Sequence, residues 1–108
     1  MAEFNLMQAL DRVNSIRTKY IHLFEFDVAL MSNTTHQMQS SFSKAMLELG
    51  LLKSHFGQSF SNASDRDLSV VGELIDLLLT ELGKQESKYW LALALVHVQY
   101  GTSSSAHL

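Results

Sequence analysis

Histidines are the side chains of this 108-residue chain that titrate near neutral pH, and they are also common metal ligands. The five are His22, His36, His55, His97 and His107. A zinc pair on a helix needs two histidines four residues apart, and no two have that spacing. A di-iron site in a helical bundle needs Glu-x-x-His, and no glutamate precedes a histidine by three residues. We therefore expect neither a metal nor a cofactor.

Nucleophiles and phosphate-binding loops are the next signs of catalysis. Serine is plentiful, but none lies in a Gly-x-Ser-x-Gly elbow. The stretch "GQSFSNAS", residues 57–64, lacks the lysine and the second glycine of a phosphate-binding loop. Cysteine is absent, which excludes disulfides and thiolate metal sites. The sequence predicts no catalytic residue, so we expect a protein that is not an enzyme.

Asp27 is a charged residue on an otherwise apolar helix face. Leucines three residues after it and four before it share that face. A buried carboxylate needs a partner or a proton. Either Asp27 reaches water at the edge of the face, or it pairs with Arg17, Lys44 or Lys88. In the second case it is a candidate polar specificity residue that fixes helix register or partner choice.

Three helices are the elements that would position these residues, over about 3–31, 37–56 and 65–100. Apolar residues recur there at steps of three and four. The chain has no proline, which favours long helices, because proline costs about 3 kcal/mol in a helix interior. The polar run "SNTTHQ", residues 32–37, either turns the chain or weakens one continuous rod of roughly 80 Å. We favour the turn.

The second helix has a seam typical of coiled coils. Its members are Met38, Phe42, Ala45, Leu49, Leu52 and Phe56. Gly50 lies inside this helix and indicates a close helix crossing. Gly57 is placed to end the helix, and Ser64 or Asp65 is placed to cap the third.

The fold class that follows is all-α. We predict a three-helix antiparallel bundle or helical hairpin with a long C-terminal helix, completed by oligomerisation. Residues 1–100 form a single helical domain, and the small polar residues 101–108 form a disordered C-terminal tail.

The composition of the chain limits the classes of partner that it is expected to bind. The net charge of −3 gives no electrostatic reason to bind nucleic acid. No stretch approaches the eighteen apolar residues of a membrane-spanning helix, and the N-terminus lacks the pattern of a secretory signal. We expect a cytoplasmic protein and disfavour a membrane partner. Charged residues make up 18%, below the usual level of about 25%, which favours burial against another protein.

The end of the third helix, "YWLALALVHVQY" at residues 89–100, is apolar nearly all round, and such helices are enclosed by several neighbours. Two shorter helices cannot wrap it completely, so we expect Trp90, Leu91, Leu95 and Val98 to bury against another chain. The residues predicted for the core or an interface are Phe42, Leu49, Phe56, Trp90, Leu91, Leu93, Leu95, Val98 and Tyr100.

We predict a non-enzymatic protein–protein interaction module: a subunit, adaptor or chaperone-like helical binder in a homodimer or hetero-complex. In size, acidity and helix content the chain is similar to small bacterial secretion chaperones. The stretch "FSKAMLELGLLKSHFG", residues 42–57, resembles a helix of the crescent-shaped BAR modules. That resemblance implies a peripheral membrane-associated helical protein as the alternative.

Overall fold

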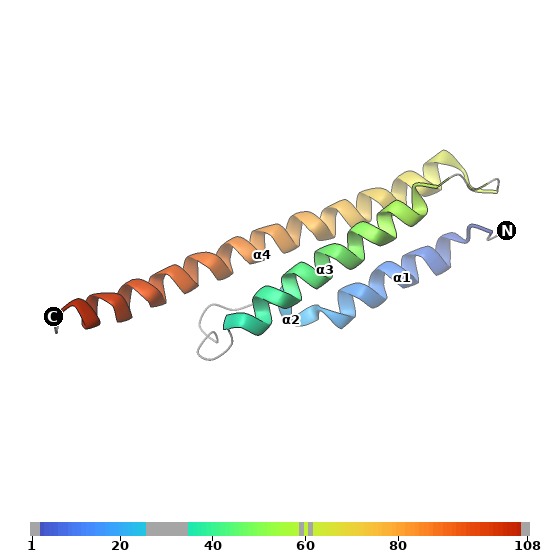
Figure 1. The fold of residues 1–108 in the computed structure, drawn as a ribbon. Helices are drawn as coiled ribbons and strands as arrows, with labels where there is room; N and C mark the ends of the chain where they lie inside the picture. Colours follow the sequence, from blue (N-terminus) through green and yellow to red (C-terminus); the bar gives the residue numbers. More distant parts are fainter. Residues whose placement is uncertain (1–2, 26–34, 59, 61, 107–108) are drawn as a thin grey trace.

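The computed structural model describes residues 3–25, 35–58, 60 and 62–106, and the side chains among them except those of 35–37 and 96–106. Every regular element in these ranges is a helix, which confirms the all-α prediction. In chain order the helices are α1 (Leu6–Lys19), α2 (Ile21–Phe24), α3 (Thr35–Phe56) and α4 (Asp65–Ala106) (Figure 1).

The three long helices α1, α3 and α4 pack side by side and alternate in direction (Figure 1). The ring of Phe4, just before α1, lies 6.0 Å from the ring of Phe56 at the end of α3. The end of α1 meets the middle of α3, where Lys19 Nζ lies 3.0 Å from Glu48 Oε1. The two helices are therefore antiparallel, and the alternative of one continuous rod is wrong.

The N-terminal helix is shorter and more broken than predicted. Asn5 caps α1 by accepting a hydrogen bond from the Gln8 N–H at 3.0 Å. Tyr20 then leaves the helical conformation, with φ −111° and ψ 26°, before α2 adds one turn. Our prediction of one helix over 3–31 is wrong at this break. The apolar spacing continues across it, because Tyr20 and Leu23 are three residues apart and both buried.

The predicted end of α3 and the predicted start of α4 are confirmed. The Gly57 N–H donates to the carbonyl of Lys53 at 2.9 Å and closes α3. Ser64 Oγ accepts from the Asp67 N–H at 3.1 Å and caps α4. The carboxylates of Asp65 and Asp67 lie in the first turn of α4, where the helix dipole favours negative charge. At its other end α4 continues to Ala106, into the predicted disordered tail.

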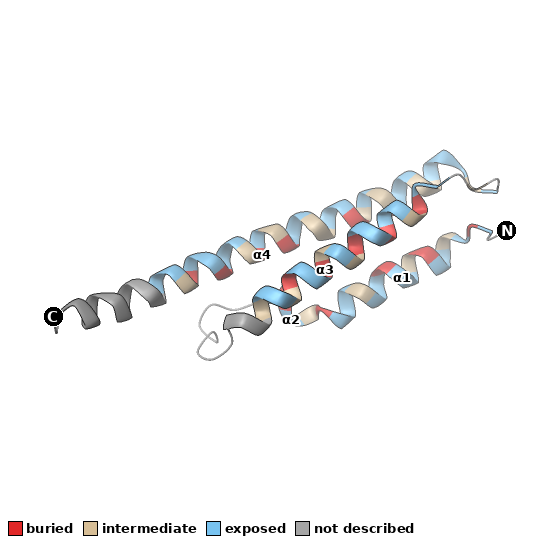
Figure 2. Ribbon diagram, viewed as in Figure 1, coloured by how far each residue is buried: buried red, intermediate tan, exposed pale blue. Residues whose placement is uncertain are grey.

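The core lies between α1, α3 and α4 (Figure 2). The predicted seam of α3 is its buried face, with Phe42, Ala45 and Leu49 at 0% exposure. α4 contributes Val71, Ile75, Leu82 and Tyr89, all at 0% exposure. Gly50 lies outside this core: a Cβ placed there would meet no atom within 4 Å. The close crossing predicted at Gly50 is therefore wrong.

The molecule is elongated, measuring 68 × 20 × 18 Å. α4 has 42 residues and, at about 1.5 Å per residue, spans nearly this whole length. The rings of Phe42 and Tyr89 lie 5.9 Å apart and mark where the start of α3 meets α4. The C-terminal part of α4 extends beyond the start of α3 (Figure 1).

Candidate interaction surface

A shallow groove of about 480 Å³ runs between α1 and α3. Its lining residues are Arg12, Ser15, Ile16, Glu48, Leu51, Leu52 and His55. Arg12 lies over the Phe56 ring, with its guanidinium carbon 5.6 Å from the ring centroid. In the described part of the chain no three histidine, aspartate or glutamate residues gather closely enough to hold a metal ion.

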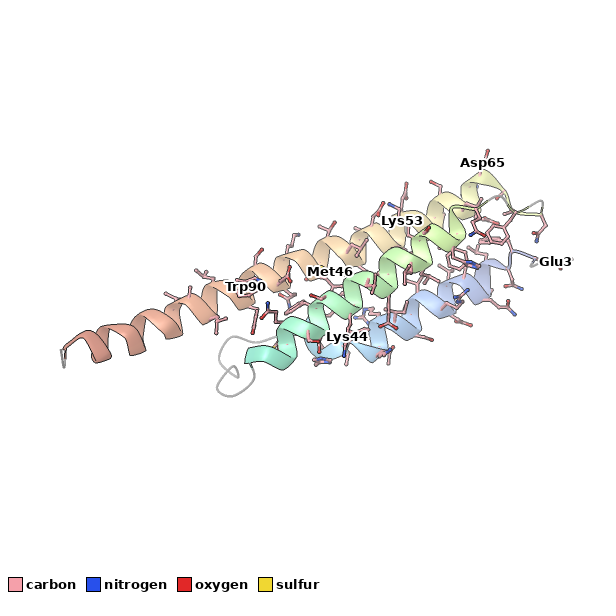
Figure 3. The ribbon with its side chains drawn as sticks, in the orientation of Figure 1. Glu3, Lys44, Met46, Lys53, Asp65 and Trp90 are labelled. Atoms are coloured by element: carbon pink, nitrogen blue, oxygen red, sulfur yellow. The ribbon has the colours of Figure 1, made fainter. Side chains whose placement is uncertain are left out.

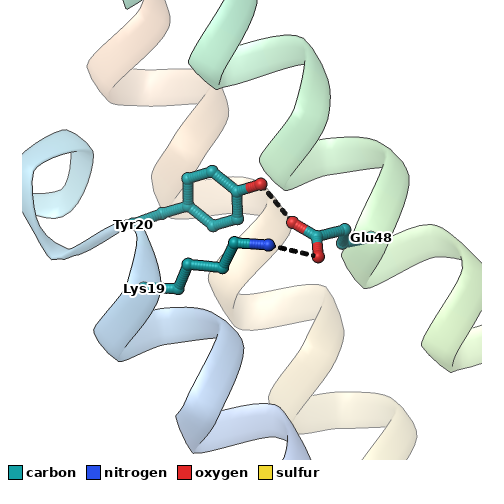
Figure 4. Close-up of polar contacts among 3 residues, drawn as sticks. All are labelled: Lys19, Tyr20 and Glu48. Carbon is teal, nitrogen blue, oxygen red and sulfur yellow. Dashed lines mark hydrogen bonds and ion pairs between the residues drawn. The ribbon is translucent and has the colours of Figure 1, made fainter.

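Glu48, the carboxylate of this groove, takes part in a link between α1 and α3 (Figure 4). The Tyr20 hydroxyl donates to Glu48 Oε2, and Lys19 Nζ donates to Glu48 Oε1 at 3.0 Å. The hydrogen bond from Tyr20, followed by that from Lys19, lowers the pKa of Glu48. The hydrogen bond to Glu48 raises the pKa of Tyr20 and also that of Lys19.

These pKa shifts make Glu48 unsuited to acid–base chemistry near neutral pH. Both carboxylate oxygens already accept hydrogen bonds, and a lowered pKa makes the group a weaker proton acceptor. Tyr20 and Lys19 likewise hold their protons more firmly than usual. The trio therefore joins two helices and offers no activated base.

A second polar link fastens the N-terminal segment to the connection between α3 and α4. The Phe4 N–H donates to Asn62 Oδ1 at 2.9 Å, and Asn62 Nδ2 donates to the Phe4 carbonyl at 2.7 Å. Both polar atoms of the Asn62 amide are thus used inside the molecule. The link holds the Phe4 ring against Phe56 and Phe60, at 6.0 and 5.6 Å between centroids.

Gln85 is a buried polar residue of α4 that the periodicity analysis missed. It is 4% exposed, and its Nε2 donates to the carbonyl of Phe24 at 2.8 Å. Phe24 is the last residue of α2, where helix carbonyls lack partners within the helix. Gln85 thus docks α2 onto α4, and its Oε1 has no hydrogen-bond partner within the described part of the chain.

The residues predicted for the core or an interface separate into two groups. Phe42 and Leu49 are fully buried and Phe56 is 8% exposed, so these three belong to the core of the chain itself. Leu93 is partly buried and packs against the same core. Three others lie on the surface of α4: Trp90 is 44% exposed, Leu91 63% and Leu95 56%.

The predictions for Val98 and Tyr100 concern side chains outside those that the structure describes, and Asp27 also lies outside the described residues. The Trp90 side chain projects from α4 (Figure 3). Its ring lies 5.5 Å from that of Tyr89, at 65°.

Two more exposed aliphatic side chains align with Leu91 along α4. Val70 is 43% exposed and Leu77 66%. Val70 and Leu77 are seven residues apart, and Leu91 follows fourteen residues later. Seven-residue spacing keeps side chains on one side of a helix, as in coiled coils. These residues therefore lie on one line along α4, opposite the side that packs on α1 and α3.

We call this line the outer stripe of α4. Its members are Val70, Glu73, Leu77, Glu81, Lys84, Lys88, Leu91 and Leu95, all exposed. Of these, the sequence analysis had assigned Leu91 and Leu95 to an interface. The seven-residue spacing of Val70, Leu77 and Leu91 is the sequence pattern that could have predicted Val70 and Leu77 as members of the same surface.

Comparison of the chain with protein-family models, with curated proteins and with solved structures finds no match in any of the three. Within the described residues, no helix combines the length and the apolar character that crossing a membrane requires.

Proposed function

We propose that this chain is a non-enzymatic protein–protein interaction module, acting as a subunit, adaptor or chaperone-like binder, with α4 as its docking helix. The observation that carries the proposal is the outer stripe. The inner side of α4 completes the chain's own core, while its outer side presents large aliphatic side chains to solvent.

The energetics of exposure support this assignment. Burying one leucine side chain is worth about 1.5–3 kcal/mol, so leaving several exposed on one line forgoes considerable stabilisation. Single exposed leucines are ordinary on protein surfaces. Leu77, Leu91 and Leu95, however, are each more than half exposed and share one helix face. Regularly spaced aliphatic residues on a helix are what a partner's groove or helix receives.

The charges on the outer stripe favour a protein over a lipid surface. A helix that lies on a membrane normally carries many lysines or arginines on its polar face. The outer stripe instead carries two carboxylates, Glu73 and Glu81, and two ammonium groups, Lys84 and Lys88. Anionic lipid would repel the first pair, whereas a protein partner can match both signs.

Site-specific photo-crosslinking in cells that make the protein tests this function. A photoreactive phenylalanine analogue replaces Leu77 or Leu91, and a matched control replaces Ser54, an exposed residue of α3. We expect discrete protein adducts from both stripe positions and none from Ser54. Equal adducts from all three positions, or none from Leu77 and Leu91, would contradict the proposal.

A further inference from the structure

The charges of the outer stripe change sign at one point along α4. Glu73 and Glu81 precede that point, and Lys84 and Lys88 follow it. All four side chains are exposed, and among the described residues none of them forms an ion pair within the chain. Asp76, by contrast, pairs with Lys53 of α3 at 2.6 Å.

The aliphatic residues are also arranged symmetrically about this point. Leu77 precedes Lys84 by seven residues, and Leu91 follows it by seven. Val70 lies fourteen residues before Lys84, and the residue fourteen after it is Val98. Rotation by 180° about an axis through Lys84 would therefore exchange aliphatic residues at these seven-residue positions, whereas Leu95 would lie opposite Glu73.

We propose that the partner of the outer stripe is a second copy of this chain, bound antiparallel with the two-fold axis at Lys84. This inference rests on the proposed function and names its partner. A two-fold interface must be self-complementary, because the same surface meets itself. The outer stripe meets this requirement where Leu77 lies opposite Leu91 and where Glu81 lies beside Lys88, while Lys84 lies on the axis and faces its own copy.

The antiparallel arrangement brings opposite charges together. Leu77 of each copy lies opposite Leu91 of the other, and Glu81 lies opposite the segment that carries Lys84 and Lys88. Lys84 and Lys88 are four residues apart, a spacing at which like charges repel on a helix, and the second copy's Glu81 relieves that repulsion. In a parallel dimer, each charged residue would instead lie beside the same residue of the other copy. Like charges would then meet, and no such ion pair would form.

Access to the outer stripe is open. The residues that pack α4 onto the rest of the chain, Val71, Ile75, Leu82 and Tyr89, lie on its other side. From residue 70 to residue 98 the contact would run for about 42 Å along the helix. Side chains of α1 and α3 need not move for a second α4 to approach.

Single-cysteine variants test the register directly, because the natural chain has no cysteine. A disulfide forms only where Cα atoms approach within about 7 Å. Under mild oxidation we expect Lys84→Cys to form a covalent dimer. Leu77→Cys alone and Leu91→Cys alone should not, whereas an equal mixture of the two should form the mixed dimer. Ser54→Cys on α3 is the matched control and should stay monomeric.

Charge exchange tests the pairing by sedimentation equilibrium. Glu81→Lys should weaken the dimer about tenfold, and Glu81→Lys with Lys84→Glu and Lys88→Glu should restore it. All these residues are exposed, so unchanged helicity by circular dichroism confirms that each variant folds.

A covalent dimer of Leu77→Cys alone would mean a parallel register and overturn the inference. A natural chain that stays monomeric at about 100 μM would also overturn it. If Leu77 and Leu91 then still crosslink in cells to a protein of different mass, the proposed function stands and only the second copy is wrong. If they crosslink to nothing, the proposed function fails as well.

Discussion

At the scale of single residues, the polar contacts of this protein serve to position helices. Tyr20 and Lys19 bind Glu48 and join α1 to α3, and Asn62 binds the backbone of Phe4. Gln85 binds the last carbonyl of α2. Each of these contacts joins residues far apart in the chain, so each fixes how one segment lies on another.

The Glu48 contact predicts a pH dependence of stability. A carboxyl group whose pKa is lowered by folding stabilises the protein above its ordinary pKa, about 4.5 for glutamate, and loses that contribution as the pH falls through the lowered value. Glu48→Gln should therefore cost about 1 kcal/mol at pH 7 and flatten the loss of stability below pH 4.5. Urea unfolding across this pH range measures the effect.

Asp11→Asn is the matched control for Glu48→Gln, because Asp11 is an exposed carboxylate of α1. It should leave the pH profile as it is in the natural chain. If Glu48→Gln and Asp11→Asn change the profile equally, the Tyr20–Glu48–Lys19 link does not contribute to stability as we describe.

At the scale of the helices, local sequence explains most boundaries. Gly57 ends α3 and Ser64 caps α4, as those residue types predict. The break at Tyr20 is different, because the apolar spacing continues across it. Its reason is tertiary: the Tyr20 hydroxyl reaches Glu48 on α3, which lies 28 positions away in the chain.

Gly50 predicts a stabilising substitution. It is exposed inside α3, and a Cβ there would meet no atom within 4 Å. Gly50→Ala should therefore raise the free energy of unfolding by about 0.5–1 kcal/mol, through the higher helix propensity of alanine. Gly57→Ala is the comparison, since Gly57 lies beyond the last helical residue and a Cβ would touch two carbonyl oxygens at 3.4 Å. A gain at Gly57 that matched the gain at Gly50 would refute this reason.

At the scale of the whole molecule, α4 belongs to two surfaces. Its inner side fills the core shared with α1 and α3, and its outer stripe faces solvent. A substitution on the inner side of α4, or on the residues that it packs against, should therefore lower the stability of the fold. A substitution on the outer stripe should instead weaken the association with a partner.

This division predicts contrasting effects of two alanine substitutions. Phe42→Ala should cost about 3–5 kcal/mol, because its ring is fully buried against Tyr89. Leu91→Ala should change the stability of the dilute chain by less than about 0.5 kcal/mol, because its side chain is 63% exposed. Thermal unfolding over a dilution series measures both effects. We expect Leu91→Ala to remove any rise of the melting temperature with concentration, which Phe42→Ala should retain.

The sequence by itself determined the all-α class, the two long helices α3 and α4, and the residues that end α3 and cap α4, Gly57 and Ser64. These features depend on local periodicity and on backbone preferences of single residues, which neighbours along the chain supply. It did not determine which apolar residues face inward: Phe42, Leu49 and Phe56 lie in the core, whereas Leu91 and Leu95 lie outside. A helix that is apolar on several sides carries more than one stripe with helical spacing, and the position of the neighbouring helices decides which stripe is buried.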